Sequence, residues 1–452
     1  MGAEREERQT ELEKRRAQRK ERAAQRERQK KARRTLLLRL TAALVLIALA
    51  AGAIVWVNRS GTQNTDPATG ETVGDTTGQT DANTTAAAVQ ADQRTEPTQP
   101  SATTVIHIAA AGDLNITDQV IRNAASGSDY DFTRAFLDVA PVFAEADLAM
   151  LNFEGTLSGE PYGTETGSAP AQIAQQLAQI GVDVVQTANS ASIRAGVLGL
   201  QSTLDGFYQA GVLPVGTFAN ERTFRKTGGY SIVEVQGIRI ALVGFTKGMD
   251  NLGLPEGSES CVNVLYTDYT SDYQKVDREK ITQVLKNVAS EKPDLTIAMV
   301  HWGSENNEEI SATQKEIRDL MLSSGVDVIL GSHPHLVQSV EYDPVNSTLV
   351  AYSLGDFFGD AARAGTAYSV ILDVEVTRDN ASGSVRVTGY DYTPIYTLLP
   401  DQSGDGGHRV VRLQETLSRY ESNYLGKITP AVYEDMSYAL QRIGERIAVE
   451  VD

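Results

Sequence analysis

Residues 325–335 read Gly325-Val326-Asp327-Val328-Ile329-Leu330-Gly331-Ser332-His333-Pro334-His335. The run Val326–Leu330 has the length and apolar character of a buried strand, and two histidines separated by one proline follow it closely. Because both imidazoles leave the end of one predicted strand, both can reach a common point. The chain has five histidines, and another of them, His301, follows a second apolar run, Leu295–Val300. This pattern is typical of a metal site, and the alternative is a pair of surface loop histidines beside a turn proline.

Short apolar runs alternate with helical patterns from residue 104 onward. Eight runs are predicted as strands: Val105–Ala111, Leu148–Leu151, Val182–Gln186, Ile238–Phe245, Leu295–Val300, Val326–Leu330, Leu349–Leu354 and Tyr368–Val376. Five stretches are predicted as helices: Phe132–Ala146, Ala171–Ile180, Leu198–Ala210, Ser271–Ser290 and Ala312–Ser323. Ser311 with Gln314 makes a capping box for the last of these helices. A hairpin over Tyr368–Thr393 and two helices over 409–449 complete the prediction, and the alternation indicates an α/β domain.

Polar side chains stand where six of these strands stop. In chain order they are Asp113, Asn152 with Glu154, Asn189, His301, His333 with His335, and Asp356. Ligands of open α/β sheets gather at the carboxyl ends of strands, so these side chains are predicted to share a cleft. Carboxylates and imidazoles together suit Mn, Zn or Fe better than calcium. Taken singly, Asp113 could cap a helix, Asn189 could serve a turn and Glu154 could be solvated.

The amino-terminal 34 residues differ in charge from the rest of the chain. Fourteen Lys/Arg and seven Asp/Glu give residues 1–34 a net charge of +7, so the remainder of a chain of net −18 carries −25. An uncharged apolar stretch of eighteen residues follows, from Leu40 to Val57, and it is long enough to cross a bilayer. The basic side is expected to be cytoplasmic. A cleaved signal peptide, with Ala51-Gly52-Ala53 as its cleavage site, is the competing interpretation.

The segment 58–103 is rich in polar and small residues and predicts a disordered extracellular linker. The sequence therefore predicts a single-pass plasma-membrane protein: cytoplasmic segment 1–34, transmembrane helix 35–57, linker 58–103, main domain 104–400 and helical extension 401–452. With Cys261 as the one cysteine, no intrachain disulfide can form. The acidic balance argues against nucleic acid as a partner, although RNA binding by the basic leader is an alternative.

The strand-end motifs resemble those of the CapA family of poly-gamma-glutamate capsule biosynthesis proteins, which is in turn similar to calcineurin-like metallophosphoesterases. The resemblance runs from Ile106 to Pro394. It rests on the motifs Ala111-Gly112-Asp113, Asn152-Phe153-Glu154-Gly155-Thr156-Leu157, Val300-His301-Trp302-Gly303-Ser304-Glu305, Gly331-Ser332-His333-Pro334-His335 and Tyr352-Ser353-Leu354-Gly355-Asp356-Phe357.

What the resemblance implies is a four-layer α/β/β/α metallophosphoesterase-like sandwich with a metal cleft at the loop ends of both sheets. The implied ligands of a divalent cation are Asp113, Glu154, His301, His333 and His335, of which Asp113, Glu154 and His333 would be catalytic. The implied binding residues around them are Asn152, Asn189, Glu305 and Asp356.

One motif departs from the family pattern, which has Ala-Asn-Asn-His followed three residues later by Asp. Here Ser190, Ala191 and Arg194 stand at the second Asn, the His and the Asp. Asp356 also stands where the family tends to have Asn. The missing histidine would assist the leaving group, and loss of such a general acid commonly costs about 10²–10⁴ in rate. Arg194 is a candidate for holding an anionic group, and a solvent-facing helix residue is the alternative.

Three functions remain open on the sequence. The first is a membrane-anchored extracytoplasmic protein of capsule or surface-polymer synthesis or export, of the poly-gamma-glutamate type, with a degenerate metal site. Its partners would be polymer synthase or export subunits and an anionic polymer. The second is an active metal-dependent phosphoesterase acting on a cell-envelope phosphate. The third is an interaction module without metal.

Overall fold

The computed structural model describes residues 102–404 and 406–447. The predicted cytoplasmic segment 1–34, the predicted span 35–57 and nearly all of the predicted linker 58–103 lie outside the described residues. Within the described part of the chain, no helix is both long enough and apolar enough to cross a membrane.

The first of two large sheets has eight strands, in the order β16-β15-β14-β1-β4-β5-β6, with β13 pairing to β1. Its strands are β1 (Thr103–Asn115), β4 (Leu148–Glu154), β5 (Val184–Gln186), β6 (Leu213–Val215), β13 (Asp356–Phe358), β14 (Tyr368–Asp379), β15 (Val385–Leu398) and β16 (Arg409–Arg412). Strands β1, β4, β5 and β6 run parallel, whereas β14, β15 and β16 pair antiparallel. The carboxyl ends of β1, β4 and β5 therefore meet at one edge.

The second sheet has six strands, in the order β11-β12-β10-β9-β8-β7. They are β7 (Ser231–Val235), β8 (Ile238–Thr246), β9 (Leu295–His301), β10 (Val328–Ser332), β11 (Val340–Asp343) and β12 (Thr348–Ala351). Strands β8, β9, β10 and β12 are parallel, and the two edge strands are antiparallel to their neighbours. A small separate hairpin joins β2 (Ala125–Ser126) and β3 (Asp129–Tyr130).

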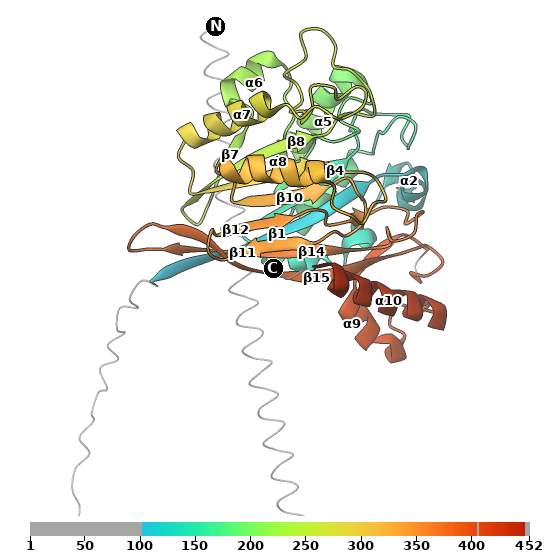
Figure 1. Ribbon diagram of the computed structural model, residues 1–452. Coiled ribbons are helices and arrows are strands. Elements are labelled where there is room, and N and C mark those ends of the chain that lie inside the picture. The colour runs from blue at the N-terminus through green and yellow to red at the C-terminus, as the bar shows by residue number, and fades with distance from the viewer. Residues whose placement is uncertain (1–101, 405, 448–452) are drawn as a thin grey trace, which may run out of the picture. The chain divides into compact units, whose positions relative to one another are not determined.

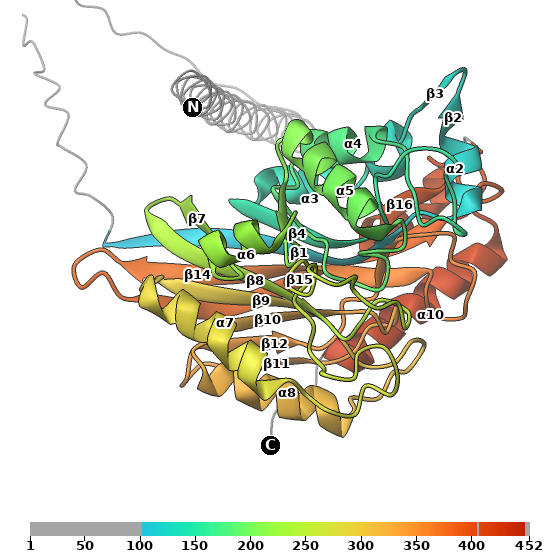
Figure 2. The ribbon, with the colours of Figure 1, turned by 90° about the horizontal axis from the view of Figure 1, so that it is seen from above.

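The two sheets pack face to face with helices on both outer sides, as the view from above shows (Figure 2). Side chains of β1 alternate: Ile106 and Ile108 enter the core between the sheets, and Ala109 and Ala111 face the helices. Strands buried on both faces in this way are almost continuously apolar, which is why the runs could be recognised in the sequence. The predicted four-layer α/β/β/α arrangement is confirmed.

The outer layers hold most of the helices (Figure 1). The first sheet is covered by α3 (Ala140–Glu145), α4 (Gln172–Ile180) and α5 (Gly196–Ala210), with α2 (Asp118–Ala124) beside them. The second sheet is covered by α7 (Arg278–Ser290) and α8 (Ala312–Ser323), whose predicted capping box between Ser311 and Gln314 is present. The remaining helical segments are α6 (Glu221–Thr227), α9 (Leu413–Ser418), α10 (Pro430–Ile447) and the 3₁₀ turns η1 (Thr133–Phe136) and η2 (Tyr420–Ser422).

Two predicted helices are wrong at their bounds. The stretch Phe132–Ala146 is broken into η1 and α3, because Pro141 stands at the start of α3 and proline favours the first turn of a new helix. The stretch Ser271–Ser290 becomes helical only from Arg278. The carboxylate of Asp277 accepts the backbone N–H of Lys280 at 2.9 Å and so caps the helix at that point.

The carboxy-terminal part is more than the two helices predicted from the sequence. Arg409–Arg412 forms β16, which extends the first sheet by pairing with β15. Helix α10 contributes Met436, Ala439 and Ile443 to the core that lies between the sheets. The predicted hairpin is confirmed, since β14 and β15 are antiparallel neighbours on either side of residues 380–384.

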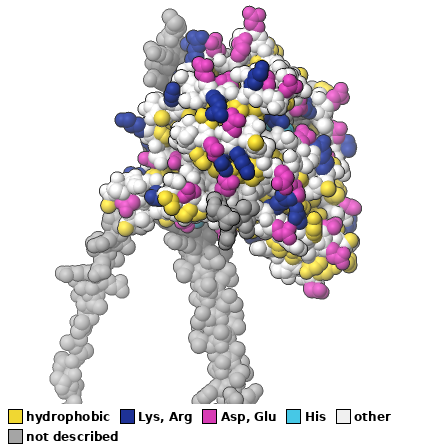
Figure 3. Space-filling view, viewed as in Figure 1, with side chains coloured by type: hydrophobic (Ala, Val, Ile, Leu, Met, Phe, Trp, Pro, Cys, Tyr) yellow, Lys and Arg dark blue, Asp and Glu magenta, His cyan; other side chains and the backbone are white. Residues whose placement is uncertain are grey.

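The surface mixes charges of both signs. Acidic and basic side chains are interspersed over the face seen in Figure 3, and apolar side chains lie singly or in small groups between them. Many of the charged side chains form exposed ion pairs, such as Arg278 with Glu316 and Arg225 with Glu221.

Candidate metal centre

The strand ends of the two sheets come together at one place. The side chain of Asp113, at the end of β1, is fully buried, and its Oδ2 accepts the backbone N–H of His333 at 3.0 Å. The backbone N–H of Asp113 donates to the carbonyl oxygen of Gly355 at 2.9 Å. A Cβ at Gly112 would lie 1.8 Å from that same oxygen, so only glycine permits this approach. The end of β1 is thus joined to the end of β10 and to the start of β13.

The His-Pro-His turn adopts an unusual backbone. His333 has φ of 92° and His335 has φ of 60°, a left-handed region that is uncommon for residues other than glycine. Such conformations cost on the order of 1–3 kcal/mol each and persist where the surroundings hold them. Here the bond from His333 to Asp113 is one restraint, and the bond from the Asn306 backbone N–H to the carbonyl of Pro334, at 2.9 Å, is another.

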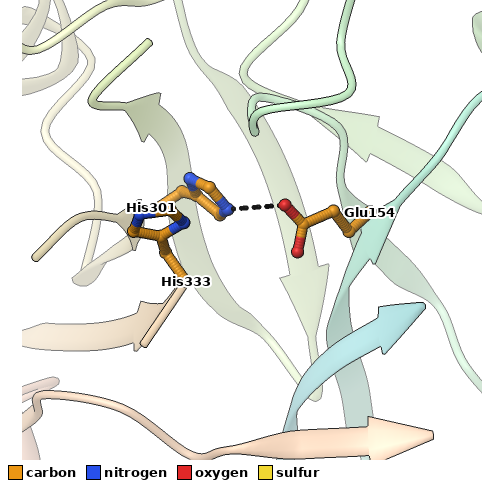
Figure 4. Close-up of side chains that lie close together, drawn as sticks. All are labelled: Glu154, His301 and His333. Atoms are coloured by element: carbon orange, nitrogen blue, oxygen red, sulfur yellow. Dashed lines mark hydrogen bonds and ion pairs between the residues drawn. The ribbon is translucent and has the colours of Figure 1, made fainter. Parts of the chain in front are cut away.

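Glu154, His301 and His333 form the first group of potential metal ligands (Figure 4). The Nε2 atom of His301 lies 3.2 Å from Oε1 of Glu154, and the rings of His301 and His333 are 4.4 Å apart between centroids. The hydroxyl of Thr246 donates to the carbonyl of Gly248 at 2.9 Å, so it accepts from Nδ1 of His301, 3.3 Å away. That bond holds the imidazole ring with Nε2 directed at Glu154.

Asp113, His335 and Asp356 form a second group. Nδ1 of His335 lies 2.8 Å from Oδ1 of Asp356 and 3.6 Å from Oδ2 of Asp113. Nε2 of the same ring lies 3.9 Å from Oε2 of Glu154, which connects this group to the first. The amide of Asn115 donates to Asp356 at 3.0 Å and fixes the carboxylate.

Glu305 joins His333 and His335 in a third group. It comes from the loop after β9, and unlike the other ligands it is exposed. Its Oε2 also accepts from Nη1 of Arg363 at 3.0 Å. The five predicted metal ligands therefore lie together, but in overlapping groups of three rather than around one point, and Asp356 and Glu305, predicted only as binding residues, belong to these groups.

The two predicted asparagines act through the carboxylates. Nδ2 of Asn152 donates to Oδ1 of Asp113 at 2.6 Å, and Oδ1 of Asn152 accepts from Asn189 at 3.0 Å. Asn189 also donates to the carbonyl of Phe153 at 2.6 Å and accepts the backbone N–H of Ala191 at 3.1 Å. Ser190 donates its hydroxyl to Oε1 of Glu154. The asparagines and Ser190 therefore orient Asp113 and Glu154.

The protonation states in this cluster favour cation binding. Burial would raise the pKa of Glu154, but the charge and hydrogen bond of His301 hold it well below its usual range. Burial and the neighbouring His301 hold the pKa of His333 well below its usual value. Neutral imidazole and ionised carboxylate are the forms that bind metals, so Glu154 and His333 are ready as ligands at neutral pH.

The second group retains a proton. Burial opposes the charge on His335, but its hydrogen bond to Asp356 and the charge of Glu154 raise the pKa of His335 to about 11. Burial raises the pKa of Asp356 to about 7 and raises that of Asp113 as well. A cation at this group would displace the proton that His335 holds.

Two buried atoms of the cluster have no hydrogen-bond partner among the described residues: Oε2 of Glu154 and Nδ1 of His333. Leaving a buried polar group without a hydrogen-bond partner costs about 1–3 kcal/mol, so two such atoms in one cluster are a reason to expect a ligand there. Carboxylate oxygen and imidazole nitrogen are donor atoms suited to Mn, Zn or Fe. The residues present therefore fit a divalent transition metal.

A cavity of about 330 Å³ opens beside the cluster. It is lined by residues of the ligand groups and of the surrounding loops, among them Glu154, Ala191, Arg194, Asp250, Glu305, His335, Asp356 and Arg363. Arg194 lies at its wall, where Nη2 pairs with Asp250 and Nη1 donates to the carbonyl of Thr164 at 3.2 Å. It is thus neither a metal ligand nor a freely solvated helix residue.

Four contributors were not predicted from the sequence: Asn115, Thr246, Asp250 and Arg363. Thr246 ends β8, so extending the strand-end rule to Ile238–Phe245 would have found it. Asn115 lies two residues beyond Asp113 on the same strand. Asp250 has no signal of this kind, because it follows the end of β8 in a loop and its role comes only from its contact with Arg194.

This architecture defines a class of protein: an α/β protein of two sheets, with a candidate divalent-metal centre where the strand ends of both sheets meet. The chain belongs to the family of bacterial capsule synthesis proteins PGA_cap, whose family model matches residues 107–361. All the candidate metal ligands lie within that match.

Two relatives of the chain are named for PGA biosynthesis and for capsule biosynthesis. The chain is 27% identical over 264 residues to the PGA biosynthesis protein CapA of Bacillus subtilis, covering 57% of this chain and 64% of that protein. It is 24% identical over 271 residues to the capsule biosynthesis protein CapA of Bacillus anthracis, covering 58% and 61%. The chain thus spans less than two thirds of the length of either relative.

Solved structures with some similarity include two phosphoesterases. One is a novel phosphatase from Mycoplasma pneumoniae, with 14% identity over 65% of this chain and 94% of that chain and a TM-score of 0.40. The other is the calcineurin-like phosphoesterase YfkN from Bacillus subtilis, with 16% identity over 72% of this chain and 98% of that chain and a TM-score of 0.41.

Proposed function

We propose that this chain acts in the synthesis or export of an anionic surface polymer of the poly-gamma-glutamate type, through a divalent-metal centre. Membership of the capsule synthesis family and the names of the two Bacillus relatives support the biological role. The observation that carries the chemistry is the convergence of three overlapping ligand groups at the edge where the strand ends of both sheets meet.

The proposed location is the outer face of the plasma membrane. It rests on the apolar stretch 40–57 with basic residues before it, which would anchor the chain once and leave the domain outside. Polymer synthase or export subunits are the proposed partners, because an anchored domain with one cleft would act on a polymer that other proteins make.

The first ligand group, Glu154, His301 and His333, and the second, Asp113, His335 and Asp356, would hold the cation or cations. A bound divalent cation would supply Lewis-acid polarisation of an anionic oxygen and a lowered pKa of its water. The chain itself supplies orientation: Thr246 orients His301, Asn115 orients Asp356, and Asn152 with Asn189 orients Asp113.

Phosphoester hydrolysis needs a group that gives a proton to the leaving group. The described residues provide no histidine for this at the position of Ala191. Ala191, at the position where the resemblance leads to a histidine, lines the cavity with a methyl group. We therefore propose binding and positioning of polymer anions, with at most slow hydrolysis, as the main role of the centre.

An active phosphoesterase is the second candidate. The overlap of the ligand groups through His333, His335 and Glu154 favours it, since two-metal hydrolases share ligands between neighbouring cations. A module that never binds metal has less support, because it would leave Oε2 of Glu154 and Nδ1 of His333 buried without a hydrogen-bond partner.

Metal loading tests the proposal. The full chain, stripped with chelator and titrated with Mn²⁺ in a calorimeter, should bind at least one equivalent. His301→Ala and His333→Ala should abolish tight binding, and His107→Ala should not, because His107 lies outside the cluster and pairs with Asp373. In the producing cell, His333→Ala should fail to restore surface polymer to a strain lacking this chain. Absence of Mn²⁺, Zn²⁺ and Fe²⁺ binding to the wild-type chain would refute the metal centre.

A further inference from the structure

We propose that the cavity beside the metal centre is a binding site for a carboxylate-bearing polymer, that Arg194 and Arg363 are its anion-binding side chains, and that it admits the polymer only when the centre holds metal. This inference rests on the proposed function and names the ligand class of the same site.

The two arginines come from different segments but face one cavity. Arg194 belongs to the loop that follows Asn189, and Arg363 to the loop that follows β13. Both line the cavity together with Glu154, His335 and Asp356 of the ligand groups. An anion bound there would therefore contact the arginines and lie next to the metal ligands.

Each arginine already holds a carboxylate of the protein. Arg194 pairs with Asp250, and Arg363 pairs with Glu305 at 3.0 Å. The guanidinium groups are thus oriented for carboxylates. Asp250 and Glu305 occupy the places that ligand carboxylates would take, and a ligand with repeated carboxylates would reproduce both contacts.

These two ion pairs are open to exchange. The side chains of Arg194 and Asp250 are 31% and 44% exposed, and those of Arg363 and Glu305 are 59% and 45% exposed. Ion pairs of such exposure contribute little to stability, so replacing the internal partner by a ligand carboxylate costs little. Glu305 also belongs to the third ligand group, and its movement toward a cation would release Arg363.

The charge of the cavity makes this binding depend on metal. Five carboxylates line it, from Glu154, Asp250, Glu305, Asp356 and Asp360, against the two guanidinium groups of Arg194 and Arg363 and the imidazole of His335. Without cations the lining therefore repels a polyanion. One or two divalent cations cancel most or all of that excess, and the arginines then supply the attraction.

A fluorescent γ-linked glutamate decamer is the probe that tests this site. Its anisotropy is measured with the full chain in chelator, and again after loading with Mn²⁺, at physiological ionic strength. We expect saturable binding only in the loaded sample, and at least tenfold weaker binding in Arg194→Ala and in Arg363→Ala. Arg225→Ala is the matched control, because Arg225 forms an exposed ion pair with Glu221 on α6 away from the cavity, and it should bind as the wild type does.

Asp250→Asn gives a change of opposite sign. It keeps the size of the side chain but removes the carboxylate that competes for Arg194, so the decamer should bind several times more tightly. Loss of folding cannot produce tighter binding, and this variant therefore separates the proposed site from a structural effect. Unchanged or weaker binding by Asp250→Asn would count against Arg194 as an anion-binding residue.

Other outcomes overturn the inference in distinguishable ways. Equal binding with and without Mn²⁺ contradicts the metal dependence, and wild-type binding by both arginine variants contradicts the site. Preference for a glycerol phosphate oligomer of the same charge contradicts the carboxylate class. Mn²⁺ titration of the same samples distinguishes two negative results. Metal binding without decamer binding contradicts only this inference, whereas absence of metal binding contradicts the proposed metal centre as well.

Discussion

The carboxylate of Asp113 accepts the backbone N–H of His333 at 3.0 Å across 220 residues of sequence. Asp113 ends a strand of the first sheet, and His333 begins the turn that follows a strand of the second. One hydrogen bond thus sets the relative position of the two halves of the cluster. Because the acceptor is a buried carboxylate, it also compensates part of the cost of the left-handed backbone at His333.

Replacement of Asp113 separates this structural role from metal binding. Asp113→Ala leaves the N–H of His333 and the amide of Asn152 without their buried acceptor, and each such loss costs about 1–3 kcal/mol. Asp113→Asn keeps one acceptor oxygen, so it should lose less stability while still weakening Mn²⁺ binding. Urea unfolding in chelator measures the first effect and calorimetry with Mn²⁺ the second. Equal stability of the two variants would show that the bond to His333 matters little.

Metal binding should release protons at neutral pH. The hydrogen bond to Asp356 raises the pKa of His335 to about 11, so the imidazole is protonated at pH 7 and must lose its proton to bind a cation. Raising the pH removes that competition, and affinity should therefore increase from pH 6 to pH 8.5. Calorimetry in two buffers of different ionisation enthalpy counts the protons. An affinity that is flat or falls with pH would argue that His335 is not a ligand.

The sequence predicted where the site residues stand along the chain, and the reason is physical. Strands such as β1 and β10 are covered on both faces, so their apolar runs are visible, and Asp113 and His333 follow those runs directly. Which ligands lie together in one group depends on how the two sheets pack against each other. Short stretches of sequence carry no information about that packing. Asp356 was therefore predicted only as a binding residue, whereas the structure pairs it with His335 at 2.8 Å.

Short edge strands were the part of the fold that could not be predicted. Strand β6 has three residues and includes Pro214, which lacks the N–H that an inner strand would need. Strand β16 directly precedes α9 and was taken as part of a helix. Such strands form because an existing sheet offers a partner, which is information from distant residues such as those of β15.

Asp327 gives a pH dependence that does not involve the metal centre. Burial raises the pKa of Asp327 to about 6 from its usual 3.8, although the backbone N–H of Thr296 donates to it at 2.7 Å. The stability this group contributes is complete below pH 3.8 and is lost as the pH rises through 6. At about 1.4 kcal/mol per pKa unit the loss is on the order of 2–3 kcal/mol.

Asp327→Asn should remove that dependence. The variant cannot ionise, so its free energy of unfolding relative to wild type should increase between pH 4.5 and pH 7.5, measured by urea unfolding in chelator. Asp343→Asn is the control, because Asp343, the half-buried last residue of β11, has a pKa that is lowered by hydrogen bonds from Asn346. A constant difference between Asp327→Asn and wild type over this range would show that Asp327 ionises normally in the folded chain.

Helix α10, which lies beyond the family match, holds the loop that carries Glu305. Arg442 donates to Glu308 at 3.1 Å and Arg446 donates to its carbonyl at 3.2 Å. Removing both arginines should loosen this loop and weaken Mn²⁺ binding by about fivefold, since partly exposed ion pairs contribute up to ~1 kcal/mol. Calorimetry measures the affinity, and proteolysis at 303–310 reports the loop. Arg419→Ala, between α9 and η2, should change neither. Wild-type affinity in the double variant would show that α10 does not influence the site.

Restoring the family motif tests why hydrolysis should be slow. Ala191 faces the cavity, and Ser190 contacts Glu154, so Ser190→Asn with Ala191→His would place an imidazole and an amide beside the centre. A positioned general acid contributes about 10²–10⁴ in rate. With Mn²⁺, the double variant should therefore hydrolyse bis(p-nitrophenyl) phosphate about 10²-fold faster than wild type, and adding His333→Ala should remove the gain. If wild type is already as fast as the double variant, and His333→Ala abolishes that activity, the centre manages without the missing histidine. The active phosphoesterase would then replace polymer binding as the better account of this site.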